Sequence, residues 1–149
     1  MTLKNLLGIS LDTVQPDAAS LDKLLSAVQR NIADAQLPGL SAENRFDAAY
    51  KAVMQCALSA MLAKGYRPST SEPGHHQTMI QSLPLTLGVG NEVWVLLDAM
   101  RRQRNASDYT GAPITPDMVR DCVAQATALR TRLRADLALH HANLLRPAD

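Results

Sequence analysis

The residues best suited to chemistry lie in one polar run, MRRQRNASDYTG, at positions 100–111. Arg104 carries a planar guanidinium, which can donate two parallel hydrogen bonds to a phosphate or a carboxylate. Asn105 and Asp108 add hydrogen-bonding groups beside it, and Tyr109 adds a phenol. These types of side chain at this spacing fit the binding of an anion such as a phosphate group.

Arg104 occupies a position where the helical period calls for an apolar residue. With residues 92–109 read as a helix, the apolar stripe runs to Met100, and Arg104 continues it one turn later. A guanidinium keeps its charge, so at such a position it needs either an ionic partner or a solvated cleft. The polar residues that flank Arg104 on this helix are Asp98, Arg101, Asn105, Asp108 and Tyr109.

Two interpretations of this polar cluster follow from the residues, and helical periodicity does not separate them. In the first, Arg104 pairs with Asp108 one turn later and holds the end of the helix in place. In the second, the cluster binds a phosphate or another anion at a site shared across a dimer interface. The binding residues of this second interpretation are Arg101, Arg104, Asn105 and Asp108.

Helices are expected to position this cluster. The apolar spacing predicts them at about residues 17–36, 41–64, 77–87, 92–109 and 116–137. Ser41 and Thr115 are predicted as N-caps and Gly111 as a C-terminal stop, while the stripe of the last helix extends toward Leu144. No segment predicts a strand. The expected fold is all-α, an antiparallel up-and-down helical bundle of four long helices plus a short one, with the second helix at its centre.

Length and composition indicate a single domain over residues 1–149, with residues 1–15 as a candidate flexible N-terminal segment. The formal net charge is only +1, so any phosphate binding must come from a local site. Aromatic residues make up 3% of the chain, which argues against a single-strand platform that stacks bases. Cys56 and Cys122 lie singly in apolar helical patterns, as core thiols of a reducing compartment do. Without a membrane-spanning apolar run, the chain is expected to be cytoplasmic and away from membranes.

Several enzyme classes are disfavoured because their motifs are missing from the sequence. It contains no Gly-rich phosphate loop, no HExxH, no CxxC and no GxSxG. A nucleotide hydrolase, a zinc enzyme and a serine hydrolase are therefore not expected, and neither is a cofactor or a metal site.

The adjacent histidines His75 and His76 fit two interpretations. They are either replacement acid–base groups or metal ligands, or they are loop residues of which one caps or packs against the following helix. Adjacent histidines on a loop point to different sides, so both rarely bind one ion.

Three stretches, read in order, resemble the HEPN family (higher eukaryotes and prokaryotes nucleotide-binding). They are ENRFDAAYKAVMQCALSAMLAKGYRP at 43–68, GHHQTMIQSLP at 74–84 and LDAMRRQRNASDY at 97–109. The resemblance covers about Ser20 to Leu137. It implies an all-α bundle that dimerises through its motif helices. Many members of the family are metal-independent endoribonucleases, often toxins with an antitoxin or nucleotidyltransferase partner, while others bind RNA, nucleotides or proteins without catalysis.

The chain departs from the family pattern at the position of the motif histidine. By resemblance, Arg104 takes the place of the motif arginine, Asn105 that of the polar residue after it, and Tyr109 that of the histidine. An imidazole with a pKa near ~6.5 exchanges protons at neutral pH, whereas a phenol near ~10 does so poorly. We therefore expect a module that binds RNA, a nucleotide or a partner protein without catalysis. The alternative is an endoribonuclease that uses Arg104 and Tyr109 as catalytic residues.

A homodimer is also expected from the sequence. Trp94 and Val95 extend beyond the main apolar stripe of the predicted helix at 92–109, so this helix can bury more than one face.

Overall fold

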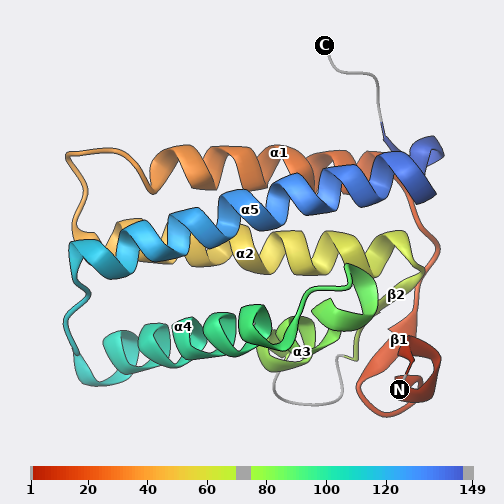
Figure 1. Ribbon diagram of the computed structural model, residues 1–149, viewed down its shortest axis with the longest axis horizontal. Coiled ribbons are helices and arrows are strands. Elements are labelled where there is room, and N and C mark those ends of the chain that lie inside the picture. Colours follow the sequence, from red (N-terminus) through yellow and green to blue (C-terminus); the bar gives the residue numbers. More distant parts are fainter. Residues whose placement is uncertain (1, 70–74, 146–149) are drawn as a thin grey trace.

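The computed structural model describes residues 2–69 and 75–145, and within them the chain forms five α-helices. These are α1 (Ala18–Asp34), α2 (Ala42–Ala63), α3 (His75–Thr86), α4 (Asn91–Thr110) and α5 (Pro116–His140). The four long helices alternate in direction along the chain (Figure 1). The prediction of an all-α up-and-down bundle with one short helix is thus confirmed.

The helix ends follow from local side-chain chemistry. The Ser41 hydroxyl accepts a hydrogen bond from the Asn44 amide at 3.1 Å, and the Thr115 hydroxyl accepts one from the Met118 amide at 3.2 Å. Gly111 ends α4 in the left-handed conformation, with a φ of 72°. All three caps agree with the sequence prediction.

α3 and α5 differ from their predicted bounds. α3 begins two residues earlier than predicted, so His75 and His76 lie in its first turn rather than in a loop. α5 ends at His140, and the apolar stripe continues through a short 3₁₀ helix, η2 (Ala142–Leu144), in which Leu144 is buried.

Two short strands correct the prediction that the chain holds none. β1 (Leu11–Thr13) pairs with β2 (Tyr66–Pro68) in an antiparallel ladder. Three residues are too few to show an alternating pattern in the sequence, and a proline at the end of a run argues against a strand. Only the tertiary pairing of these two segments makes them strands.

The described part of the segment 1–15 is folded against the bundle. A 3₁₀ helix, η1 (Leu3–Leu6), precedes β1, and Leu11 within β1 is completely buried. Leu3 and Leu11 belong to the same apolar core as the helices.

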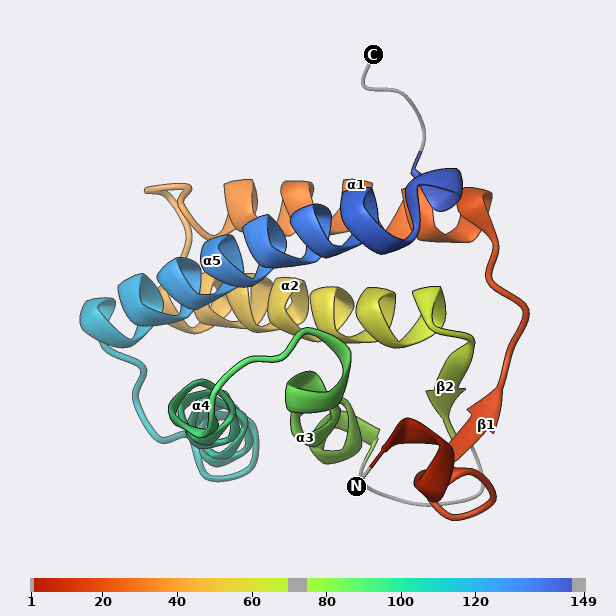
Figure 2. The same ribbon diagram turned by 45° about the vertical axis from the view of Figure 1, so that its right-hand side comes forward.

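α2 lies at the centre of the molecule, as predicted. It packs against α1 and α5 on one side and against α3 and α4 on the other (Figures 1 and 2). α4 crosses it obliquely, since it is seen lengthwise in Figure 1 and end-on in Figure 2. The face of α2 that meets α3 and α4 is therefore the face that Arg104 can reach.

The prediction that both cysteines lie in the core is confirmed. Cys56 and Cys122 are buried free thiols, and Tyr50 is almost completely buried. No helix in the described ranges is both long enough and apolar enough to span a lipid bilayer.

Candidate functional site

Arg104 lines a cavity of about 320 Å³ where α2, α3 and α4 meet. We call it the Arg104 cavity, and its lining residues are Asp47, Tyr50, Lys51, Met54, His76 and Arg104. The four that come from α2 are spaced at i, i+3, i+4 and i+7, so they lie on one face of that helix. α3 contributes His76 from its first turn, and α4 contributes Arg104 from its last two turns.

The Arg104 guanidinium lies between two carboxylates from different helices. Its Nε is 3.5 Å from Asp108 Oδ2 on α4 and 4.0 Å from Asp47 Oδ1 on α2. Both distances are at the long end for an ion pair, and Arg104 donates no hydrogen bond to any described residue. With 32% of its side chain exposed, Arg104 keeps donors that a ligand in the cavity can reach.

The Tyr50 ring contacts the Arg104 guanidinium. The Arg104 Cζ lies 5.3 Å from the centroid of the Tyr50 ring, within the range of a cation–π interaction. This contact places the guanidinium beside α2 without using any of its N–H groups as hydrogen-bond donors.

The phenol of Tyr50 also contacts His76. Its Oη lies 3.0 Å from His76 Nδ1, and the two rings are tilted with their centroids 5.6 Å apart. Burial raises the pKa of Tyr50 to about 12, so the phenol stays protonated and can donate to Nδ1. In that tautomer His76 carries its own proton on Nε2; in the other, Nδ1–H donates to the phenol and Nε2 holds a lone pair.

Burial and nearby charges shift the pKa of two more groups, His76 and Asp47. Burial, followed by the nearby Arg104 guanidinium, lowers the pKa of His76 below its ordinary value, so the imidazole is neutral at pH 7. Burial and the neighbouring Asp108 raise the pKa of Asp47, while Arg104 and Lys51 act in the opposite direction. The cavity therefore combines the cations of Arg104 and Lys51 with the Asp47 carboxyl and a neutral imidazole.

The structure separates the predicted site residues into two groups. Arg104 lines the cavity and has Asp108 3.5 Å away, as predicted, but neither Asp108 nor Arg101 belongs to the lining. Arg101 instead pairs within α4. Its Nε is 2.9 Å from Asp98 Oδ1, and Arg102 binds the other oxygen of this buried carboxylate at 2.9 Å. These three residues form an ion-pair group internal to α4.

Asn105 and Tyr109 also lie outside the lining of the Arg104 cavity. Asn105 is half-buried, whereas 85% of the Tyr109 side chain is exposed. His75 is exposed as well, so only one of the adjacent histidines reaches the cavity.

Two cavity residues, Asp47 and Lys51, were not singled out by the sequence pattern. The available signal was the polar positions at i and i+4 in an otherwise apolar helix, on the same face as Tyr50. That signal is weak, because lysine and aspartate on one edge of a helix usually mark a solvated face.

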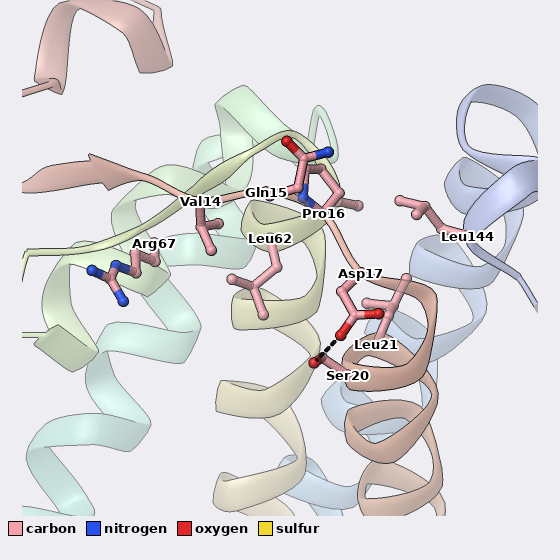
Figure 3. A pocket seen from close by; sticks show the side chains of 10 residues that line it. Val14, Gln15, Pro16, Asp17, Ser20, Leu21, Leu62, Arg67 and Leu144 are labelled. Atoms are coloured by element: carbon pink, nitrogen blue, oxygen red, sulfur yellow. Dashed lines mark hydrogen bonds between the residues drawn. The ribbon is translucent and has the colours of Figure 1, made fainter.

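A second cavity of about 210 Å³ lies between the start of α1 and the end of α2 (Figure 3). We call it the Asp17 cavity. Arg67 of β2 and Leu144 of η2 stand at its two sides, and Leu21 and Leu62 contribute apolar surface. The Asp17 carboxylate accepts hydrogen bonds from the Ala19 amide at 3.0 Å and the Ser20 hydroxyl at 2.6 Å.

Comparison of the chain with protein-family models, with curated proteins and with solved structures gives no match. The HEPN resemblance thus rests on the sequence motifs alone. Among residues 2–69 and 75–145, no three His, Cys, Asp or Glu side chains are grouped as a metal ion would require.

Proposed function

We propose that the Arg104 cavity binds a phosphate group of RNA or of a nucleotide. The observation that carries this proposal is an arginine that faces a cavity, lies on a tyrosine ring and donates no hydrogen bond to any described residue. Such a guanidinium has paired donors available for two phosphate oxygens. The Lys51 ammonium, on the same cavity wall, adds a second positive charge.

The volume of the cavity agrees with this class of ligand. At about 320 Å³ it lies at the lower end of the range of small-ligand pockets, which is ~300–1,000 Å³. A phosphate with its attached sugar fits such a space. A duplex does not enter it, so a nucleic acid would place one backbone phosphate there and keep the rest on the surface.

A bound phosphate would exchange partners with the carboxylates that now flank Arg104. Asp47 and Asp108 neutralise the guanidinium in the free protein, at distances that leave both ion pairs weak. A phosphate that forms two short charge-assisted hydrogen bonds would replace them. Arg104 therefore has a partner in both states. Without ligand it pairs with the carboxylates and holds the end of α4, and with ligand it binds the phosphate.

Binding can be tested by thermal melting and calorimetry with a nucleoside monophosphate and with a short RNA. We expect both ligands to raise the melting temperature of the wild-type protein and Arg104→Ala to abolish the shift. Arg104→Lys should retain part of it, because lysine keeps the charge but not the paired donors. Arg120→Ala is the matched control, since Arg120 is an exposed arginine paired with Asp117 on α5.

Two results would contradict the phosphate proposal. One is a wild-type protein whose melting temperature neither ligand changes. The other is an unaltered ligand affinity in Arg104→Lys. If Arg104→Ala fails to fold, the lysine variant carries the test, because it keeps the positive charge between the two carboxylates.

Metal-independent RNA cleavage is the second candidate, and the position of His76 favours it. The imidazole absent from position 109 is present in the Arg104 cavity, brought there by α3. In the tautomer whose Nδ1–H donates to the Tyr50 phenol, His76 Nε2 would accept the proton of a ribose 2′-hydroxyl as that oxygen attacks phosphorus. The bond to the 5′ oxygen would break, water would protonate that oxygen, and Arg104 would stabilise the charge on the phosphoryl oxygens.

Cleavage is separated from binding by incubating total RNA with the purified protein in the presence of a metal chelator. If His76 is the base, His76→Ala and Arg104→Ala lose cleavage, whereas Tyr109→Phe retains it. Intact RNA with the wild-type protein would leave binding as the function. An antitoxin or nucleotidyltransferase gene beside this one would favour a toxin role.

We also propose a homodimer through α4. Val95 and Leu96 are 53% and 39% exposed on a helix whose other face is in the core, so they leave apolar surface for a second copy. Light scattering at micromolar concentration should give the mass of a dimer. Val95→Asp should lower it to that of a monomer with an unchanged helix content, and a monomeric wild-type protein would contradict the proposal.

A further inference from the structure

The end of α4 presents two faces with different neighbours. Arg104 faces α2 and the Arg104 cavity, and Asp108 lies one turn later beside it, whereas Asn105 and Tyr109 follow each of them by one residue. One residue turns an α-helix by ~100°, so the second pair lies on the adjacent, outward side. Within the motif RNASDY, Arg104 thus belongs to the cavity, while Asn105 and Tyr109 belong to the surface beside it.

Tyr109 is unlike the other aromatic residues of the chain. Phe46 and Tyr50 are buried, and Tyr66 and Trp94 pack partly against the core. Tyr109 is 85% exposed and packs against no part of the core. A ring with this exposure buries little area within the chain and leaves its faces open to a planar partner.

The ring lies near the phosphate site but on another side of α4. Tyr109 follows Arg104 by five residues, which gives a rise of ~7.5 Å along the helix and a turn of ~140° about its axis. An extended strand that reaches both side chains therefore crosses the end of α4, with the stacked base beyond the nucleotide whose phosphate binds Arg104. Asn105, four residues before Tyr109, lies on the same face and offers an amide that can donate to and accept from the edge of a base.

Building on the phosphate site proposed above, we infer that Tyr109 stacks one base of a single-stranded nucleic acid whose backbone phosphate binds Arg104. A single exposed ring holds one base rather than a run of bases, in agreement with the low aromatic content of the chain. The ligand class is therefore an extended single strand, of RNA or DNA, and not a duplex whose bases are already stacked.

The surroundings of Tyr109 favour a nucleic acid over a second protein. Its neighbours Asp108, Thr110 and Asn105 are polar, so the ring is not part of an apolar patch. The exposed apolar surface of α4 lies at Val95, fourteen residues earlier and thus ~21 Å away along the helix. A dimer formed there leaves Tyr109 accessible.

The test is fluorescence anisotropy with labelled oligonucleotides of one sequence as single-stranded RNA, single-stranded DNA and duplex, with unlabelled inorganic pyrophosphate as a competitor. Tyr109→Ala should weaken single-strand binding by about tenfold, the loss expected for one stacked base. Tyr109→Phe and Tyr109→Trp should bind like wild type, as should the neighbouring control Thr110→Ala. Pyrophosphate should bind Tyr109→Ala as well as it binds wild type, because the Arg104 cavity is unchanged.

The outcomes separate this inference from the phosphate site on which it rests. Single-strand affinity that is unchanged in Tyr109→Ala but lost in Arg104→Ala would overturn the stacking inference alone. A wild-type protein that binds neither oligonucleotide nor pyrophosphate would overturn both proposals. A preference for duplex, or a change from dimer to monomer in Tyr109→Ala by sedimentation, would also overturn the inference, the latter by assigning this face to a second copy. Binding of RNA and DNA alike supports it, and a preference for RNA supports it with an added contact to the 2′-hydroxyl.

Discussion

The Arg104 cavity and the Asp17 cavity each contain an arginine, an aspartate and apolar walls, but they use their charges differently. The Asp17 carboxylate binds an amide and a hydroxyl within the first turn of α1, so it serves the helix that carries it. The charges of the Arg104 cavity come from α2 and α4, and its imidazole from α3. Apart from the Arg104–Asp108 pair within α4, these charges serve no local structure, and under the proposed function they are available to a ligand. The candidate site of this molecule thus lies where side chains from separate helices meet.

The largest expected difference between the two cavities is in the free energy of unfolding that is lost when a lining side chain is truncated to alanine. Tyr50 is a core residue as well as a cavity residue, so Tyr50→Ala should lower the free energy of unfolding by about 3–5 kcal/mol. Leu144→Ala in the Asp17 cavity should cost less, because η2 is a single terminal turn that can adjust. Urea unfolding measures both values. Equal losses would show that the Arg104 cavity is no better integrated into the core than the Asp17 cavity.

A second contrast concerns the two aspartates. Asp17→Ala should lower the free energy of unfolding by about 1 kcal/mol, since it removes the N-cap of α1. It should leave the affinity for a nucleoside monophosphate unchanged. Asp47→Asn should have the opposite profile, with little change in stability and a changed affinity. Denaturant unfolding and calorimetry on the same two variants test this pairing, and a loss of ligand affinity in Asp17→Ala would break it.

The helices of this fold could be predicted because their signals are local. Ser41, Thr115 and Gly111 mark helix ends through hydrogen bonds or dihedral angles within a few residues, and these positions were confirmed. The pairing of β1 with β2 joins segments more than fifty residues apart, and neither segment is long enough to show a pattern. Such a contact depends on the packing of α1 and α2 between them, which no local rule describes.

The candidate site could be predicted only in part for the same reason. Arg104 was identified because a charge interrupts its own apolar stripe, and its pairing with Asp108 lies within one helical turn. His76 was left between two interpretations, since its distance from Tyr50 depends on how α3 docks on α2. Asp47 gave only the weak signal of a polar position on an otherwise apolar helix. What a site takes from its own helix can be read from the sequence, whereas what it takes from other helices requires the fold.

A third prediction tests whether the carboxylate beside Arg104 competes with a ligand for the guanidinium. If Asp108 competes with a ligand for the guanidinium, Asp108→Asn should raise the affinity for a nucleoside monophosphate. We expect a gain of about 1.4- to fivefold, since partly exposed ion pairs are worth about 0.2–1 kcal/mol. Asp98→Asn is no substitute, because that carboxylate binds Arg101 and Arg102. Calorimetry gives the affinities, and weaker binding in Asp108→Asn would mean that this carboxylate orients Arg104 for the ligand.

The smallest expected effect is a pH dependence of stability that belongs to the Arg104 cavity. Burial lowers the pKa of His76 from its ordinary value of 6.5, so below pH 6.5 the unfolded chain binds a proton that the folded protein does not yet bind. The stability from neutral His76 is therefore fully present above pH 6.5, and it is lost as the pH falls from there through the lowered pKa. His76→Gln cannot titrate, so its free energy of unfolding should decline less steeply below pH 6.5. The pKa of His141 is lowered as well, again mainly by burial, but this residue is present in both proteins and cancels in the difference. Urea unfolding of the two proteins between pH 5 and 8 measures that difference, and parallel curves would mean that His76 is solvated like a surface histidine and takes no part in the cavity.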